Sequence, residues 1–475
     1  MPRAFRVRFS KQGRSVDPSL HIDAASDPAL AEARPRQKSR YGCLECKKGK
    51  VKCDEAHPSC NRCQRRGIKC TVTARLSRWR LEKPGFDWPP SCPAPSCSLR
   101  IDARLLQWWM DATCKILVLD LHLNPLSLPL IEHLGVSPAL CLALESFSLG
   151  HRGCWATKSR VEFFEKRSHA LSLCREELTS KAVPLETSFY TVMLLGLTTP
   201  FMEDIDDYGK EHLIGARTIL EILLRQNDST RDPKIEQLLA YYTWWDMSCS
   251  FSVDPREIPA LSTSEVLSVT SRGDAEPVGA RFAGCMVEIY HLLGLLLRYC
   301  MQVLRGGARD PEHERTLELA LTSRYRPDRI RDEDVLFAEA FRNHGLIILY
   351  RVCRIRRMTD VQGGMPWTDN SSVASRIHGY ALKIISLVLP TQIGTPFWNS
   401  LAIPLLTAGS ELTVDDQVLR NNVREAFSSV LNQCRTNTVA RAKDLLEEVW
   451  IRRDNGIEIS YLELALQKGW NFSLV

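Results

Sequence analysis

The sequence predicts a small metal-stabilised domain joined by a proline-rich linker to a large all-α body. Three observations predict this organisation: six cysteines fall within residues 43–70, five prolines fall within residues 84–99, and apolar patterns with a helical period recur from about residue 100. A chain of 475 residues favours two or three domains. With 44% hydrophobic and 25% charged residues, wholesale disorder is not expected.

The charge divides the chain near the same place. Residues 1–83 hold 21 Lys and Arg against 8 Asp and Glu, a net charge of +13, and the remaining 392 residues hold 41 against 48, a net charge of −7. A basic head on a slightly acidic body indicates a polyanion-binding end. Residues 1–39 are polar without a sustained period, so we expect a flexible basic arm. Its basic run at 34–40 suits import into the nucleus as well as phosphate contact.

The cysteines are expected to lie in a reducing compartment. The first ten residues contain no apolar core typical of a secretory signal. The apolar run at 189–197 is too short to span a membrane, and His291 and Arg298 interrupt the run at 289–304. We therefore expect no membrane partner. In a reducing compartment a cysteine pattern indicates a metal site more often than disulfides.

Residues 40–75 are predicted to form the metal-binding domain. Its cysteines are Cys43, Cys46, Cys53, Cys60, Cys63 and Cys70, and the second three repeat the first three after 17 positions. The repeat predicts two equivalent half-sites related by a local two-fold axis. Two Zn²⁺ ions need eight coordination positions, which six thiolates provide if two sulfurs each bridge both metals. Metal binding then supplies most of the folding free energy, of order 10 kcal/mol. The alternatives are disulfides or a storage cluster for soft metals.

Basic residues lie between the ligands in both halves of the cluster. Lys47, Lys48, Lys50 and Lys52 in the first half are the candidate DNA contacts, and the second half adds Arg62, Arg65, Arg66 and Lys69. Two Zn²⁺ ions and six thiolates leave a charge of about −2, which these cations offset. A lysine at the end of a short helix can enter the major groove, where N7 and O6 of guanine are acceptors. Flanking lysines neutralise phosphates whatever the sequence.

Residues 43–70 resemble the DNA-binding domain of the fungal binuclear zinc-cluster transcription factors. The resemblance covers the six cysteine positions, the basic run before Cys53, the Asp54 that follows it, and Pro58. It implies a zinc-stabilised two-helix DNA-binding domain in which Cys43 and Cys60 bridge the metals. It also implies that Lys50 contacts the bases of a CGG triplet and that Lys47 and Lys52 contact phosphates.

Gly49 departs from the family pattern, because many members carry Arg or Lys at this position. We expect the glycine to remove one basic contact and to lower helix propensity by roughly 1 kcal/mol.

The chain after the predicted linker, 76–99, is expected to be all-helical. Apolar stripes of helical period include Leu213, Ala216, Leu220, Leu223 and Leu224 in one segment, and Val161, Phe164, Leu171, Cys174 and Leu178 in another. The charged segment 306–333, broken by Gly and Pro, is expected to be a surface excursion. The 11 cysteines outside the cluster are expected to be small core residues.

Three segments of the body resemble the regulatory domain of the same family. They are 212–224, 403–412 and 439–454. The resemblance implies that 100–475 is an all-helical fungal transcription factor regulatory domain.

These observations predict a nuclear, sequence-specific DNA-binding regulator of transcription by RNA polymerase II. Double-stranded DNA is the expected partner, with transcriptional co-regulators. Residues 71–83 hold fewer than two heptads, so we expect a homodimer through the helical body, or binding as a monomer. The alternative is a zinc-stabilised module that binds a protein or RNA. The chain shows no nucleotide-binding Gly-rich loop, HExxH or GxSxG motif, so no enzyme is expected.

Overall fold

The computed structural model describes residues 43–51, 53–54, 60–70, 101–117, 124, 126–153, 157–202, 207–226, 232–270, 278–323, 332–355, 370–390 and 399–470. The chain divides into two compact units, 1–86 and 87–475, which are described separately below. The predicted arm and linker lie outside the described residues. So do Lys52 and the side chain of Lys47.

The first unit contains two short helices, α1 (Leu44–Lys48) and α2 (Asn61–Arg65). Among its described residues the buried side chains are cysteines: five are 1–4% exposed, and Cys70 packs partly buried against them. Apolar side chains near the helix ends, such as Leu44, Val51 and Ile68, are instead exposed. A fold with so little apolar burial depends on what the cysteines bind.

The second unit is all-α over its described residues, which confirms the predicted fold class. Its α-helices are α3 (Ala103–Trp108), α4 (Cys114–Ile116), α5 (Leu128–Leu134), α6 (Pro138–Gly153), α7 (Thr157–Ser180), α8 (Leu185–Gly196), α9 (Lys210–Gln226), α10 (Pro233–Cys249), α11 (Thr263–Thr270), α12 (Val278–Leu304), α13 (Pro311–Thr322), α14 (Asp332–Cys353), α15 (Asn370–Val388), α16 (Ala402–Ser410), α17 (Gln417–Cys434), α18 (Asn437–Asp454) and α19 (Tyr461–Gln467). A π-helical turn (Trp109–Thr113) joins α3 to α4, and short 3₁₀ turns cover Thr199–Phe201 and Val414–Asp416.

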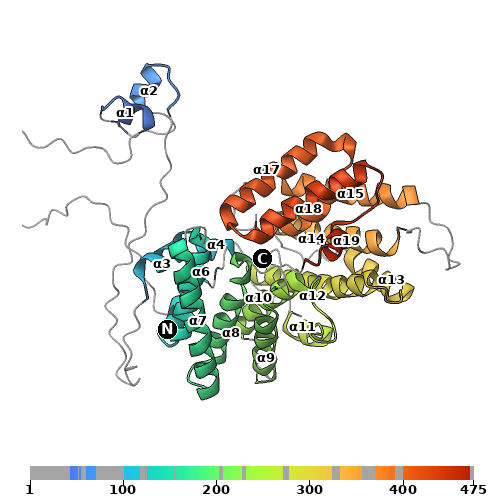
Figure 1. The fold of residues 1–475 in the computed structure, drawn as a ribbon, viewed down its shortest axis with the longest axis horizontal. Coiled ribbons are helices and arrows are strands. Elements are labelled where there is room, and N and C mark those ends of the chain that lie inside the picture. Colours follow the sequence, from blue (N-terminus) through green and yellow to red (C-terminus); the bar gives the residue numbers. More distant parts are fainter. Residues whose placement is uncertain are drawn as a thin grey trace, which may run out of the picture. The chain divides into compact units, whose positions relative to one another are not determined.

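The helices of this body pack in sequence order around a continuous apolar core. Helix α6 packs on α7 and α8, α8 on α9, α10 on α12, α12 on α14, and α14 on α15 and α16 (Figure 1). The C-terminal end of α17 contacts α6, where His151 Nε2 lies 2.8 Å from the Gln433 carbonyl oxygen. The buried apolar side chains of the described body form one continuous cluster.

Two buried charge networks join helices that are distant in sequence. Arg298 on α12 donates from Nη1 to Asp246 Oδ2 on α10 at 2.9 Å. On α14, Arg351 pairs with Glu411, which also accepts from Arg453 Nη1 at 2.9 Å. All these side chains except Arg453 are at most 10% exposed. Such buried pairs fix which helix faces meet, because either charge alone would be costly.

Helix α12 contains a 19-residue stretch, Met286–Leu304, that is long and apolar enough to cross a membrane by length and composition. In this structure the stretch is a core helix: it packs against α10, α11 and α14, and it carries the buried Arg298.

The periodicity of α9 predicts its buried face correctly, since Leu213, Ala216, Leu220 and Leu223 are buried. The predicted stripe on α7 is correct for Cys174, which is buried, and for Leu171, which packs partly buried against the core. It is wrong for Val161, Phe164 and Leu178, which are exposed, and it misses Phe163 and Ala170, which are buried.

The reason for the error on α7 is the polar residue Glu177. This residue lies on the buried side, where its carboxylate accepts from the Ala139 amide at 2.9 Å and the Ser137 hydroxyl at 2.7 Å. The Glu177 carboxylate of α7 thus lies buried at the start of α6. A search for apolar residues does not assign a position occupied by a charged residue to the core-facing side of a helix.

The expected surface excursion at 306–333 is also wrong over its middle, which forms α13. Asp310 caps this helix by accepting from the amides of Glu312 and His313, and Pro311 occupies its first position. The described cysteines of the body are buried free thiols, which confirms their predicted core role: Cys114, Cys141, Cys174, Cys249, Cys300, Cys353 and Cys434.

Candidate metal centre and nucleic-acid interface

The 17-residue repeat of the cysteines is also a repeat of the backbone. Cys43 Sγ accepts from the Cys46 amide at 3.4 Å at the start of α1, and Cys60 Sγ accepts from the Cys63 amide at 3.4 Å at the start of α2. The sulfur of the first cysteine of each half therefore caps its helix. A helix N-terminus favours negative charge, so this position stabilises a thiolate.

The two helices also end in the same way. The Val51 amide donates to the Cys46 carbonyl at 3.0 Å, and the Ile68 amide donates to the Cys63 carbonyl at 3.2 Å. Between each pair lies a residue in the left-handed conformation, Lys50 with φ 50° and its counterpart Gly67 with φ 61°. This is the Schellman arrangement of hydrogen bonds at a helix C-terminus. The two halves predicted from cysteine spacing thus share the same local backbone conformation.

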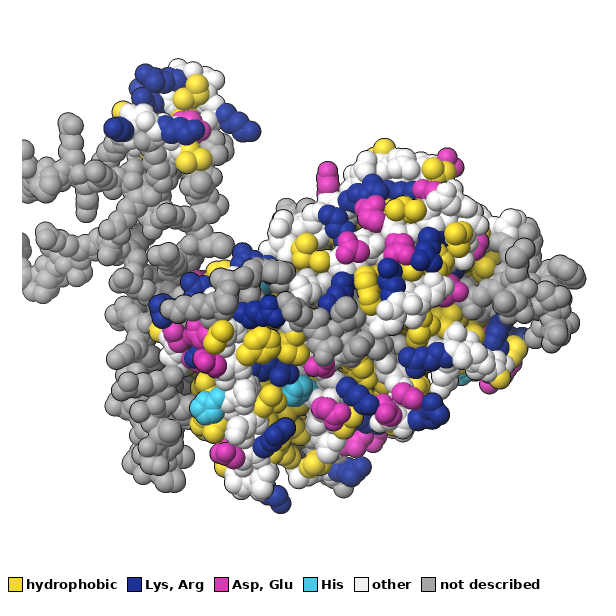
Figure 2. All heavy atoms as spheres, in the orientation of Figure 1, with side chains coloured by type: hydrophobic (Ala, Val, Ile, Leu, Met, Phe, Trp, Pro, Cys, Tyr) yellow, Lys and Arg dark blue, Asp and Glu magenta, His cyan; other side chains and the backbone are white. Residues whose placement is uncertain are grey.

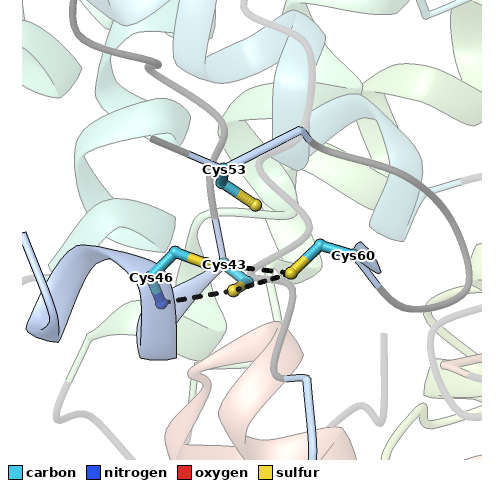
Figure 3. A group of neighbouring side chains, drawn as sticks. All are labelled: Cys43, Cys46, Cys53 and Cys60. Carbon is cyan, nitrogen blue, oxygen red and sulfur yellow. Dashed lines mark hydrogen bonds between the residues drawn. The ribbon is translucent and has the colours of Figure 1, made fainter. Parts of the chain in front are cut away.

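The six sulfurs form two overlapping groups of four. One group is Cys43, Cys46, Cys53 and Cys60, the other is Cys43, Cys60, Cys63 and Cys70, and the sulfurs within each group lie within 4.8 Å of one another. The side chains of the first group point toward a common centre (Figure 3). Cys43 and Cys60 belong to both groups, which is the arrangement that two metals with two bridging sulfurs require.

The spacing of the sulfurs fits tetrahedral zinc. Cys43 Sγ lies 3.8 Å from Cys60 Sγ and 3.6 Å from Cys63 Sγ, and Cys46 Sγ lies 3.7 Å from Cys60 Sγ. Zn–S bonds of about 2.3 Å in a tetrahedron place sulfurs about 3.8 Å apart. A disulfide needs a separation of about 2.05 Å. The described cysteines are therefore not disulfide-bonded in this structure.

The crowding and burial of the thiols make them resist losing their protons. Burial, reinforced by the neighbouring sulfurs, raises the pKa of Cys46 to about 12 and also raises the pKa of Cys63. Without a compensating charge these groups would remain protonated at neutral pH. A bound divalent ion reverses this preference, because a coordinating thiol loses its proton. The donor set therefore fits zinc, which prefers four sulfur ligands in structural sites.

Two basic residues of the first half, Lys48 and Lys50, lie at the C-terminal end of α1. Lys48 is the last residue of the helix, and Lys50 follows it with an exposed side chain. Dark blue side chains gather on this unit (Figure 2). Lys50 adopts the left-handed backbone that its counterpart Gly67 adopts without a side chain. This conformation costs an L-residue about 1 kcal/mol or more, and such strain often marks a functional position.

Two details were not predicted from the sequence. Asp54 Oδ2 accepts from the Asn61 amide at 3.1 Å, so this carboxylate caps α2. Gly49 lies just after α1, where it does not lower helix propensity as we expected of a helical position. The matching positions of the two halves are the signal that could have shown the helix ends, because Gly67 marks a left-handed residue 17 positions after Lys50.

Comparison with known families agrees with this geometry. Residues 41–80 match the Fungal Zn(2)-Cys(6) binuclear cluster domain, and residues 104–475 match the Fungal specific transcription factor domain. Together these domains define zinc-cluster transcription factors, which bind DNA and regulate transcription. The second match covers most of the chain, so the protein belongs to this fungal transcription factor family.

Curated relatives match over short segments. A Zn(2)-C6 fungal-type transcription factor of Gibberella zeae is 51% identical over 37 residues, 8% of each chain. Transcription factor pgmR of Aspergillus terreus is 39% identical over 75 residues, 15% of this chain and 39% of its own. The Zn(2)-C6 fungal-type transcription factor afumD of Aspergillus fumigatus is 53% identical over 61 residues, 13% of this chain and 16% of its own. The matched segments thus span less than half of these relatives, and no solved structure matches.

Proposed function

We propose that the protein is a sequence-specific regulator of RNA polymerase II transcription that acts in the nucleus and holds two Zn²⁺ ions. The proposed ligands are Cys43, Cys46, Cys53, Cys60, Cys63 and Cys70. The single observation that carries this proposal is the pair of four-sulfur groups that share Cys43 and Cys60. Bound zinc would supply rigidity, since it fixes the ends of α1 and α2 relative to each other. No observation favours an enzymatic role.

The proposed DNA contacts follow from the end of α1. Lys50 is exposed there, and its ammonium can donate to N7 and O6 of guanine in a CGG triplet. Lys47, Lys48 and Lys52 flank it in sequence and would neutralise phosphates, which adds affinity that does not depend on sequence. The left-handed backbone of Lys50 directs its side chain differently from those on the helix.

A titration of the full-length protein with CGG-containing and scrambled duplexes tests the base contact. Lys50→Gly removes the side chain and keeps the left-handed backbone, as Gly67 does in the second half. The variant should lose about 1–3 kcal/mol of preference for the CGG duplex. Lys48→Ala is the matched control and should weaken both duplexes equally. If Lys50→Gly weakens binding to the CGG and scrambled duplexes equally, Lys50 does not contact bases. If the protein binds RNA and neither duplex, the RNA-binding alternative is favoured.

We propose that co-regulators and a second copy of the chain bind the helical body. Support comes from the short segment at 71–83, which holds fewer than two heptads. The mass of the protein–DNA complex in the same titration tests for the second copy. One chain bound to a duplex that carries one CGG triplet would contradict the proposed dimer.

A further inference from the structure

We propose that Arg62, on α2, supplies the cation that Gly49 lacks and contacts a DNA phosphate beside Lys50. This inference rests on the proposed contact between the end of α1 and DNA. It adds to the interface a residue from the other half of the zinc cluster, and it explains how the glycine is tolerated within the basic run.

The guanidinium of Arg62 lies beside the backbone of Gly49. A Cβ added to Gly49 would lie 3.3 Å from Arg62 Nη1 and 3.6 Å from Arg62 Nη2. The guanidinium therefore occupies the space that a side chain at position 49 would enter. Because Gly49 lies between Lys48 and Lys50 in the chain, the charge of Arg62 falls within the basic run of the first half.

The guanidinium is free to bind a ligand. Within the part of the chain that the structure describes, the side chain of Arg62 makes no hydrogen bond or ion pair, although the residue is only partly exposed. Its five N–H donors match the oxygens of a phosphate better than a lysine ammonium does. By contrast, the carboxylate of Asp54, close to α2, is engaged by the Asn61 amide.

The fold does not require a cation at this position. The counterpart of Arg62 in the first half, 17 residues earlier, is Glu45, and both halves form the same helix with the same terminal hydrogen bonds. Lys48 and Lys50 repel the positive charge of Arg62. A DNA phosphate bound among these cations would offset the repulsion, because its negative charge attracts all three. The competing explanation is that Arg62 only neutralises the zinc thiolates; in that case its removal would release zinc.

The experiment is a salt titration of zinc-loaded full-length protein on CGG-containing and scrambled duplexes. Arg62→Ala should weaken both duplexes equally by several-fold and should reduce the slope of log affinity against log salt by about 0.9. Zinc content should not change. The matched control is Arg66→Ala, an exposed arginine just after α2, which should leave the slope unchanged.

A rescue variant makes the test specific. In Gly49→Arg combined with Arg62→Ala, the cation returns to position 49 and the guanidinium nearest to its Cβ is removed. Affinity and salt slope should recover. Loss of zinc from Arg62→Ala, an unchanged slope, or an equal effect of Arg66→Ala would each overturn the inference. If the wild type does not prefer the CGG duplex, the proposed base contact is refuted but the proposed phosphate contact is not. The phosphate contact is tested by the slope of log affinity against log salt, which is measured on both duplexes.

Discussion

The two units of this chain are stabilised in opposite ways. The first buries five cysteines and leaves apolar side chains such as Val51 and Ile68 exposed. The second buries a large apolar core whose biggest fully buried side chains include Trp109, Trp245 and Trp450. A unit whose described residues bury so little apolar surface gains its stability from metal coordination, whereas the body gains it from the hydrophobic effect. The difference implies that the first unit can unfold while the second stays folded.

Removal of zinc should therefore have the largest effect, and only on the first unit. A strong chelator should cost the cluster of order 10 kcal/mol of folding free energy. We expect residues 43–70 to become sensitive to protease and DNA binding to be lost, while a fragment covering the helical body stays resistant. Proteolysis followed by mass spectrometry measures both.

Cysteine variants sharpen this result. Cys60→Ser removes a sulfur that both four-sulfur groups share, and Cys434→Ser changes a buried cysteine of the body. The first should release zinc and the second should not. A cluster that stays protected from protease without metal would contradict the comparison.

The next largest effect should come from the buried charges of the body. Arg351→Ala leaves Glu411 buried with Arg453 as its remaining partner, and breaking such a pair costs about 3–5 kcal/mol. Urea unfolding followed by tryptophan fluorescence measures the change. The control is Arg256→Ala, whose partner is Asp254 in an exposed pair worth about 0–1 kcal/mol. Zinc content should be unaltered in both variants, and a similar loss in the two would refute the argument.

How much the sequence predicts differs between the units for a physical reason. The chemistry of the cluster follows from local spacing, so the cysteines alone indicate the metal and its two half-sites. The position of Arg62 on Gly49 depends on how the halves meet in space, which spacing does not contain.

In the body, apolar periodicity predicts helices because each helix must bury one face. It fails where a tertiary partner stabilises a buried polar group, as Ser137 and Ala139 do for Glu177. It also fails at α13, whose charged sequence hides the helix start at Asp310. The buried pair of Arg298 and Asp246 joins residues 52 positions apart and leaves no local signal.

The smallest expected effect is the acid sensitivity of the helical body. His344 on α14 is buried, its Nδ1 lies 2.8 Å from Thr407 Oγ1, and desolvation lowers its pKa to about 3. An unfolded histidine has a pKa of about 6.5. Its contribution to stability is therefore complete above pH 6.5 and is lost as the pH falls toward 3, because only the unfolded state then binds the proton.

Between pH 7.5 and pH 5, His344 should cost the body about 2 kcal/mol of unfolding free energy. His344→Gln, a neutral side chain of similar size, should reduce the loss over this interval by that amount. Urea unfolding at both pH values measures it, with chelator present so that protonation of the zinc thiolates does not contribute. An equal pH dependence in wild type and variant would mean that His344 is not held neutral in the folded body, and that its burial contributes no acid sensitivity of its own.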